Sequence, residues 1–353
     1  MTTKRDFLGL EDFSWVEIEA LLSLAERIKR GEVAGGLEGR IMAMAFLDPS
    51  LRTRNSFESA MFLHGGLATV IEPGKGSWAW ETDPHAVMDG DRVENIVEAA
   101  RVLGRYADVV GVRAFARGKD WAEARLDRVV RSFAEHCEKP VINLESARQH
   151  PCQALADALT IREKMPAPWG RRFVVSWAWH PKPLPTAVPV SAALAAARLG
   201  MEVVIARPTG WDFDSEDMAL LRRTAREGGA VLQITEDMDE ACEGADVVYA
   251  KSWGSLEHFG DPAEELARRA DLKDWILTED RVRSTRRGEG LVMHCLPVRR
   301  NVEIEDRVLD GPNSVVIDQA ENRLHVQRAL LLDLLGAAPD REGLLQGRAE
   351  GAA

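Results

Sequence analysis

The sequence predicts an α/β protein with two doubly wound, parallel-sheet domains joined by helices, and with the active site in the cleft between the domains. One reason is size and composition, because 353 residues that are 45% hydrophobic can form two cores of ordinary size. A second is that short apolar runs alternate with amphipathic helical patterns, which is typical of parallel α/β sheets. A third is that the conspicuous polar motifs follow strand-like runs, where open α/β sheets collect their ligands.

In the first half of the chain, strand-like and helical patterns alternate. The expected strands are Ile41–Leu47, Ala68–Ile71, Val109–Val112 and Pro140–Asn143. The expected helices are Ser14–Arg30, Leu51–His64, Arg92–Tyr106 and Asp127–His136. These elements predict a first domain over residues 1–149.

The second half repeats the alternation. Its expected strands are Phe173–Trp177, Glu202–Ala206, Val231–Ile234, Val247–Ala250, Leu291–His294 and Val315–Ile317. The alanine-rich segment Val190–Leu199 predicts a helix that ends at Gly200. These elements predict a second domain over residues 150–320.

Helices are expected to join and close the two domains. His150–Lys164 links the halves, and Asn322–Leu335 is apolar at helical spacing. Residues 321–336 are therefore expected to form a C-terminal helix that packs back on the first domain. Residues 337–353 are rich in glycine, alanine and charge, and we expect a disordered tail there.

Composition excludes several classes of function. The net charge of −12 argues against a general nucleic-acid or membrane-surface binder. No apolar run is long enough to span a bilayer, and the polar N-terminus is unlike a signal peptide. The cysteines are far apart without paired metal spacing, which favours reduced thiols in a cytoplasmic protein and predicts no metal site. No G-x-G-x-x-G or P-loop follows a strand, so a Rossmann nucleotide-binding protein is not favoured.

The most informative segment follows the first expected strand. Ser50 is a candidate N-cap, and the first helical turn after it contains Arg52, Thr53 and Arg54. Backbone N–H groups at a helix N-terminus favour an anion, whereas cations there oppose the helix dipole. Two arginines in this turn are explained by a multiply charged anionic ligand such as a phosphate. The alternative is a surface turn with two solvated arginines.

This segment, S-x-R-T-R, resembles the carbamoyl-phosphate loop of the aspartate/ornithine carbamoyltransferase family. Further motifs resemble the family in the same order: Gly111-Val112-Arg113, His150-Pro151-Cys152-Gln153, His294-Cys295-Leu296-Pro297 and Glu321-Asn322-Arg323. The resemblance covers about residues 40–335. It implies an enzyme that moves the carbamoyl group of carbamoyl phosphate to an amine without a cofactor.

The resemblance also assigns residues to carbamoyl phosphate. These are Ser50, Leu51, Arg52, Thr53, Trp78, Arg113, His150, Gln153, Cys295, Leu296 and Arg323. Arg113, His150 and Thr53 are expected to stabilise the tetrahedral oxyanion that forms when the amine attacks. Cys295 is expected to position the substrate rather than to attack it. Arg54 is expected to support the loop through internal pairing.

The identity of the amine depends on Lys251. The H-C-L-P motif is similar to that of ornithine enzymes. Elsewhere in those enzymes, an aspartate binds the α-ammonium group of ornithine, and this chain has Lys251 at the corresponding position. A lysine would repel an ammonium group but would accept a neutral amide. We therefore expect the α-nitrogen to be acylated. The alternative is that the Lys251 side chain extends to solvent.

Other features resemble the N-acylornithine branch of the family. They are Trp78 in a loop that in that branch enters a neighbouring active site, the segment from His180 to Pro185, and Val298-Arg299-Arg300-Asn301. The residues expected to bind N-acylornithine are Glu145, His180, Lys182, Lys251, Arg299 and Val93. The loop implies a homotrimer.

The acyl group is expected to be succinyl rather than acetyl. Enzymes of the acetyl type resemble the chain around Val93 but carry glutamate there, and they carry lysine where Glu303 stands. The spacer Ala147-Arg148-Gln149 also resembles the succinyl type. The alternatives are an N-acetylornithine enzyme, then an ornithine or other-amine carbamoyltransferase, and a non-catalytic binding member of the family.

Overall fold

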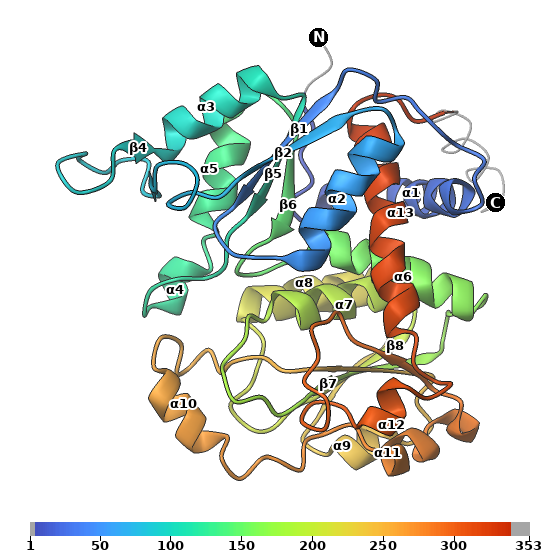
Figure 1. Cartoon of the computed structure of the whole chain (residues 1–353). Helices are drawn as coiled ribbons and strands as arrows, with labels where there is room; N and C mark the ends of the chain where they lie inside the picture. Colours follow the sequence, from blue (N-terminus) through green and yellow to red (C-terminus); the bar gives the residue numbers. More distant parts are fainter. Residues whose placement is uncertain (1–3, 340–353) are drawn as a thin grey trace. The chain divides into compact units, whose positions relative to one another are not determined.

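The computed structural model describes residues 4–339, and the chain divides into two compact units (Figure 1). Unit 1 contains the residues up to Ala116, Leu126–Leu155 and those from Arg323 on, and unit 2 contains Arg117–Arg125 and Ala156–Asn322. Each unit is built on its own parallel sheet. The predicted domain limits at residues 149 and 320 stay a prediction, because units defined by contacts need not coincide with folding domains.

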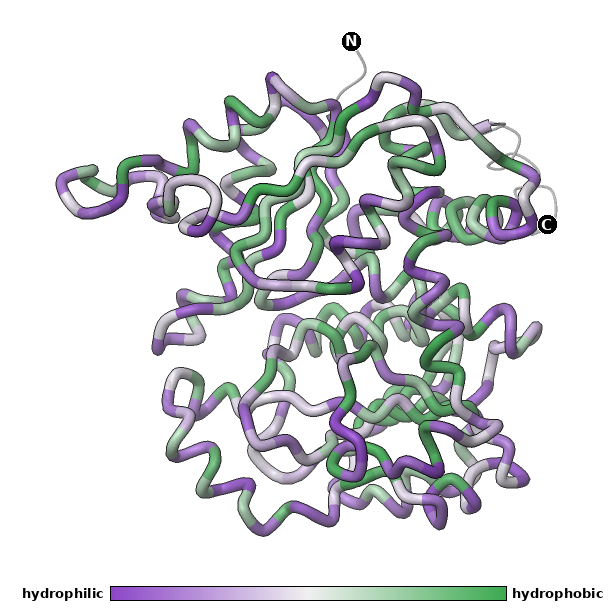
Figure 2. Tube along the Cα trace, in the orientation of Figure 1, coloured by the Kyte–Doolittle hydropathy of each residue, from purple (hydrophilic) through white to green (hydrophobic). Residues whose placement is uncertain are grey.

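The sheet of unit 1 has the order β2-β1-β5-β6. These strands are β1 (Ile41–Phe46), β2 (Leu67–Ile71), β5 (Val109–Arg113) and β6 (Val141–Glu145). A separate two-stranded pair consists of β3 (Trp80–Glu81) and β4 (Glu94–Asn95). Strands β1 and β5 are buried and largely apolar, as the green stretches in Figure 2 show. The parallel sheet therefore forms the centre of this unit.

Helices cover this sheet because each presents an apolar face. They are α1 (Trp15–Lys29), α2 (Leu51–Leu63), α3 (Ile96–Tyr106) and α5 (Arg128–His136). Ile96 of α3 and Phe133 of α5 belong to one buried cluster with Val110 and Val112 of β5. Helix α1 begins at a capping box in which Ser14 and Glu17 satisfy each other's backbone N–H groups. Expected strand and helix positions in this half are confirmed, except that α3 begins later because Asn95 caps it.

The sheet of unit 2 has the order β11-β10-β7-β8-β9. Its strands are β7 (Arg172–Trp177), β8 (Glu202–Ala206), β9 (Leu232–Thr235), β10 (Val247–Lys251) and β11 (Leu291–Met293). Its helices are α4 (Trp121–Ala124), α7 (Ala187–Arg198), α8 (Ser215–Gly228), α9 (Met238–Cys242), α10 (Pro262–Arg268), α11 (Glu279–Ser284) and α12 (Asp306–Leu309). The alanine-rich α7 is buried along almost its whole length, which small side chains permit.

Two long helices, α6 (Pro151–Lys164) and α13 (Val316–Leu334), each contribute residues to both units. Within unit 2 they are linked by Asn322, whose Nδ2 donates to Thr160 Oγ1 over 2.9 Å. Both expected helices are therefore present, and their roles in joining and closing the domains stay a prediction. Residues 340–353 of the predicted tail lie outside the described residues.

The predicted strand Val315–Ile317 is wrong. The chain makes a single bridge there, between Ser314 and Val292, and Val315 N donates to Val292 O over 3.0 Å. Helix α13 then begins at Val316. A short apolar run fits the buried first turn of a helix as well as a strand, so periodicity could not separate them.

Within residues 4–339, no helix is both long enough and apolar enough to cross a membrane.

Candidate functional site

The N-terminus of α2 is formed as the sequence predicts. Ser50 is its N-cap, and Ser50 Oγ accepts a hydrogen bond from Thr53 N over 3.2 Å. Leu51 is exposed and Thr53 is buried, so the two side chains leave the first turn in different directions. Arg54 pairs with Glu58 at 3.3 Å and with Glu72 at 3.8 Å, which confirms its internal role.

Arg323 of α13 brings three predicted residues together. Its Nη2 donates to Thr53 Oγ1 over 2.9 Å, and its Nη1 donates to Gln153 Oε1 over 2.8 Å. The same Nη1 lies 3.4 Å from His150 Nε2. Arg323 is 2% exposed, so the guanidinium acts inside the protein. Residues far apart in sequence thus form one buried group within unit 1.

Arg113 and Glu145 join this group from the ends of two neighbouring strands. They are register partners at the ends of β5 and β6. Arg113 Nη1 donates to Glu145 Oε2, which also lies 3.4 Å from His150 Nε2. Arg113 Nε is buried and has no hydrogen-bond partner among the described residues. We call Ser50, Arg52, Thr53, Arg113, Glu145, His150, Gln153 and Arg323 the Arg113 cluster.

The Arg113 cluster carries an excess of positive charge. It contains three arginines, Arg52, Arg113 and Arg323, and the single carboxylate of Glu145. Burial and the charges of Arg323, Arg113 and Arg52 hold the pKa of His150 well below its usual value of 6.5, so its imidazole is neutral at pH 7. Such a cluster can hold an anion and can offer a neutral N–H from His150 to a carbonyl oxygen.

A second group lies in unit 2, at the end of β10. Lys251 is the last residue of that strand and is 7% exposed, so the alternative in which its side chain extends to solvent is wrong. His180, also buried, accepts at Nε2 from Arg299 Nε over 2.9 Å. Its other nitrogen, Nδ1, lies 2.9 Å from Lys182 O. Nδ1 also accepts from Lys182 N over 3.0 Å, and burial lowers the pKa of His180 from its usual value of 6.5.

Glu303 completes this second group. Its Oε2 accepts from Arg299 N over 2.9 Å, and its Oε1 lies 3.4 Å from His294 Nε2. Burial would raise the pKa of Glu303, but the hydrogen bond and charge of His294 and the charge of Lys251 lower it to about 2. The group has three cationic side chains, those of Lys182, Lys251 and Arg299, and one buried carboxylate. We call His180, Lys182, Lys251, His294, Arg299 and Glu303 the Lys251 cluster.

The H-C-L-P turn is held by side chains that sequence reasoning missed. His294 N donates to Gln319 Oε1 over 3.0 Å, and Gln319 Nε2 donates to Asp157 Oδ1 over 2.7 Å. Leu296 N donates to His294 Nδ1 over 2.8 Å, with Leu296 at φ +56°. Gln319 precedes Arg323 by one helical turn, so both side chains lie on the same face of α13. This spacing is the feature of the sequence from which Gln319 could have been identified.

Cys295 lies beside the hydroxyl of the fully buried Tyr249, whose pKa burial raises well above 10. All of the cysteines are unpaired, and burial raises the pKa of Cys152 to about 12. The Cys152 thiol is therefore not a nucleophile at neutral pH.

Five predicted site residues are exposed, and Leu51 and Arg299 are two of them. Trp78 and Val93 are 70% and 64% exposed and flank the β3–β4 pair of unit 1. Lys182 is also exposed, although its carbonyl oxygen is engaged by His180.

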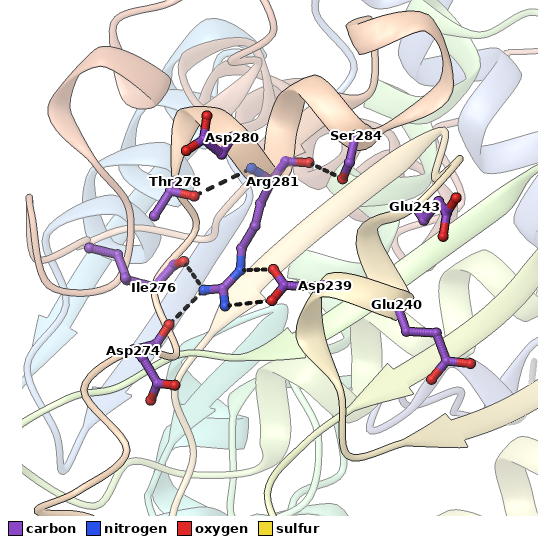
Figure 3. A pocket seen from close by; sticks show the side chains of 9 residues that line it. All are labelled: Asp239, Glu240, Glu243, Asp274, Ile276, Thr278, Asp280, Arg281 and Ser284. Atoms are coloured by element: carbon purple, nitrogen blue, oxygen red, sulfur yellow. Dashed lines mark hydrogen bonds and ion pairs between the residues drawn. The ribbon is translucent and has the colours of Figure 1, made fainter.

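A separate hollow of about 730 Å³ lies between α9 and α11 (Figure 3). Arg281 points into it, and its guanidinium is saturated by Asp239 and by the carbonyl oxygens of Asp274 and Ile276. The described residues that line it include none of the predicted site residues. The hollow is therefore not the candidate site.

Comparison with known proteins gives the family context of these clusters. Residues 5–163 match the family model described as the aspartate/ornithine carbamoyltransferase carbamoyl-P binding domain. Residues 185–334 match the aspartate/ornithine carbamoyltransferase Asp/Orn binding domain. The two matches together cover most of the chain; they include the whole Arg113 cluster and all of the Lys251 cluster except His180 and Lys182.

Individual relatives are similar over nearly the whole chain. An N-acetylornithine carbamoyltransferase from Xanthomonas campestris pv. campestris is 45% identical over 94% of this chain and 98% of its own length. An N-succinylornithine carbamoyltransferase from Bacteroides fragilis is 34% identical over 85% of this chain and 89% of its own length. One solved structure is a glutamate-to-valine mutant of N-acetyl-L-ornithine transcarbamylase complexed with carbamyl phosphate and N-succinyl-L-norvaline. It has a TM-score of 0.90 and 45% identity, and the match covers 93% of this chain and 99% of that chain.

Proposed function

Because this chain belongs to the aspartate/ornithine carbamoyltransferase family, we propose that it transfers the carbamoyl group of carbamoyl phosphate to the δ-amine of an N-acyl-L-ornithine. The products are N-acyl-L-citrulline and phosphate, in arginine biosynthesis. The observation that carries this proposal is the Arg113 cluster, in which the predicted residues of four distant motifs meet in one group.

In this proposal the Arg113 cluster binds carbamoyl phosphate. Ser50, Arg52, Thr53 and the N–H of Leu51 hold the phosphate at the N-terminus of α2. Arg113 has a buried Nε–H without a protein partner among the described residues, which leaves a donor for the ligand. The resemblance adds the backbone of Cys295 and Leu296 to this site.

The same cluster supplies the stabilisation that the reaction needs. The δ-amine attacks the carbamoyl carbon, the carbonyl oxygen gains negative charge, and the bond to phosphate breaks. His150, neutral because of burial and its arginine neighbours, donates to that oxygen without losing its proton. Gln153 holds the carbamoyl amide, and the departing phosphate takes the proton of the amine. The chemistry requires no enzyme nucleophile, so Cys295 positions the substrate.

The Lys251 cluster is proposed to bind the amino-acid portion. Of its cations, Lys251 is buried and Arg299 is exposed, and its one carboxylate, Glu303, accepts from the backbone N–H of Arg299. This excess of positive charge favours the α-carboxylate of the substrate and disfavours a free α-ammonium. An acylated α-nitrogen carries no charge and meets that requirement. Glu145, at the edge of the Arg113 cluster, is proposed to contact the same substrate.

N-acetyl-L-ornithine is the better supported acyl substrate. The N-acetylornithine relative is 45% identical and the N-succinylornithine relative is 34% identical. Glu303 also offsets positive charge that a second carboxylate would need, because its carboxylate interacts with His294 and with the charge of Lys251. N-succinyl-L-ornithine remains the second candidate, since Val93 lacks the negative charge that acetyl-type enzymes carry there. The mutant structure with valine in place of a glutamate and N-succinyl-L-norvaline bound supports that second candidate.

The assembly proposed is a cytoplasmic homotrimer in which Trp78 enters the neighbouring active site. Trp78 is 70% exposed, and Phe62 and Leu67 of unit 1 are 79% and 57% exposed. Strand β2 is an edge strand, so Leu67 lies at an open border of the sheet. Large exposed apolar side chains of this kind support a contact with another chain.

The test is the formation of citrulline-type product from carbamoyl phosphate with N-acetyl-L-ornithine, N-succinyl-L-ornithine and L-ornithine, measured side by side. Product from the acylated amines but not from ornithine is expected. Product from ornithine at an equal rate would contradict the proposed role of Lys251. The absence of product with all three amines would contradict the proposed function.

A further inference from the structure

Arg269 is the largest charged side chain that unit 2 buries completely. It follows α10 as its C-cap residue and is 0% exposed. Its Nη2 donates to Glu265 Oε1, and Glu265 is 1% exposed. The guanidinium lies 5.6 Å from the centre of the Trp177 ring. A buried ion pair is costly because both ions lose their hydration, so it is weak evidence for a role in stability alone.

The second arm of the Arg269 guanidinium binds the backbone of a loop. Arg269 Nη1 donates to His180 O over 2.7 Å and to Lys182 O over 3.0 Å. One nitrogen thus bridges two carbonyl oxygens on either side of Pro181. The residues whose backbone it holds are two predicted substrate residues, and one of them, His180, is hydrogen-bonded to Arg299.

The remainder of this loop is tied to the same place. Gly254 N donates to Leu184 O over 2.8 Å. A Cβ added to Gly254 would lie 3.1 Å from Pro183 Cβ and 3.2 Å from Glu265 Oε2. The loop from His180 to Pro185 has no regular secondary structure, so side chain-to-backbone bonds determine its shape.

We infer that Arg269, held by Glu265, is a positioning residue that fixes the loop from His180 to Pro185 and thereby sets the affinity for the amino-acid substrate. The inference rests on the proposed function of the Lys251 cluster. Arg269 touches no substrate. It acts through His180, because it holds the carbonyl oxygens of His180 and Lys182, and Lys182 N donates to His180 Nδ1 over 3.0 Å.

The test compares substrate affinities in steady-state kinetics of the full chain. In Arg269→Met, the KM for N-acetyl-L-ornithine should rise roughly 10- to 100-fold, because small displacements of binding groups weaken substrate binding strongly. The KM for carbamoyl phosphate should stay within about twofold, since none of the described contacts of Arg269 involve the Arg113 cluster. Arg269→Lys retains the charge without the planar fork and should restore only part of the affinity.

A double variant separates this role from the ion pair. Glu265→Leu combined with Arg269→Met removes both buried charges, so the variant should fold with wild-type melting temperature or higher. It still lacks the donors for the loop, and its KM for N-acetyl-L-ornithine should stay high. The matched control is Arg268→Met, which removes an exposed pair with Glu264 on the same helix and should change neither KM.

The outcomes distinguish this inference from the proposed function. A folded double variant with wild-type KM values for both substrates would overturn the positioning role. Equal rises in both KM values would also overturn it, because they would indicate a general loss of structure. A wild-type chain that forms no N-acylcitrulline would overturn the proposed function instead.

Discussion

The Arg113 cluster and the Lys251 cluster are built in different ways. In the first, regular elements supply the side chains: Arg113 and Glu145 end paired strands, and Arg323 comes from a long helix. In the second, Lys251 ends a strand, but His180, Arg299 and Glu303 come from loops that hydrogen bonds to side chains hold in place. Elements fix the first geometry directly, whereas the second depends on its supporting contacts.

The two clusters also differ in charge. The first opposes three arginines to one carboxylate, which suits a small, doubly charged anion. The second combines the buried Lys251 and the exposed Lys182 and Arg299 with the carboxylate of Glu303, which suits a molecule with one carboxylate and a neutral amide. The difference indicates that local sequence motifs predict the recognition of carbamoyl phosphate. The choice of amine depends instead on a network of contacts among residues that are distant in sequence. The predictions below test that difference.

The largest effect is expected at Arg113. Arg113→Gln should lower kcat about 100- to 1000-fold, because the variant loses a charged donor to the developing oxyanion. The measurement is product formation at saturating concentrations of both substrates. Arg54→Gln is the control, since Arg54 pairs with Glu58 and Glu72 and should keep kcat near the wild-type value. If the kcat of Arg113→Gln stays within roughly threefold of the wild-type value, Arg113 does not contribute to the reaction.

Glu303 should matter for stability as well as for binding. Its pKa falls from 4.5 to about 2 on folding, so its ionised form contributes about 3 kcal/mol above pH 4.5, and this contribution disappears as the pH falls towards 2. Glu303→Gln should therefore lower the free energy of unfolding by about that amount at pH 7. Denaturant unfolding at several pH values measures it. Glu257→Gln, at an exposed position, should have no comparable effect.

Val93 should affect only the choice of acyl group. Val93→Glu should shift the ratio of kcat/KM values about fivefold towards N-acetyl-L-ornithine over N-succinyl-L-ornithine, because a surface charge contact is worth about 1 kcal/mol. The matched control is Val93→Gln, which has the same shape without the charge. If both variants leave the ratio unchanged, Val93 lies away from the acyl group.

The smallest effect on kcat is expected from a moderate decrease in pH. The pKa of His150 lies well below 6.5, because burial and three arginines disfavour its protonated form. At saturating substrates, kcat should change less than about twofold between about pH 8 and pH 6. A loss of activity centred near pH 6.5 would show that the buried imidazole takes up a proton in the working enzyme.

The sequence predicted the parallel sheets and most of the Arg113 cluster because both leave contiguous signals. Apolar runs with turn signals predict strands, and Ser50 with two arginines predicts an anion-binding helix end. It could not predict that Glu303 would be buried against His294 and Arg299, since that contact depends on how a loop folds back. Nor could it identify Arg269 or Gln319, which act on backbone carbonyl and amide groups and therefore belong to no side-chain motif.

The central claim is that Lys251 makes this enzyme select an acylated amine. Its most direct test is the ratio of kcat/KM for N-acetyl-L-ornithine to that for L-ornithine, in wild type and in Lys251→Asp. We expect the wild type to prefer the acylated amine by about 100-fold or more, and the aspartate variant to narrow that ratio at least about tenfold. A wild-type enzyme that uses both amines equally, with a ratio that Lys251→Asp does not change, would contradict the claim.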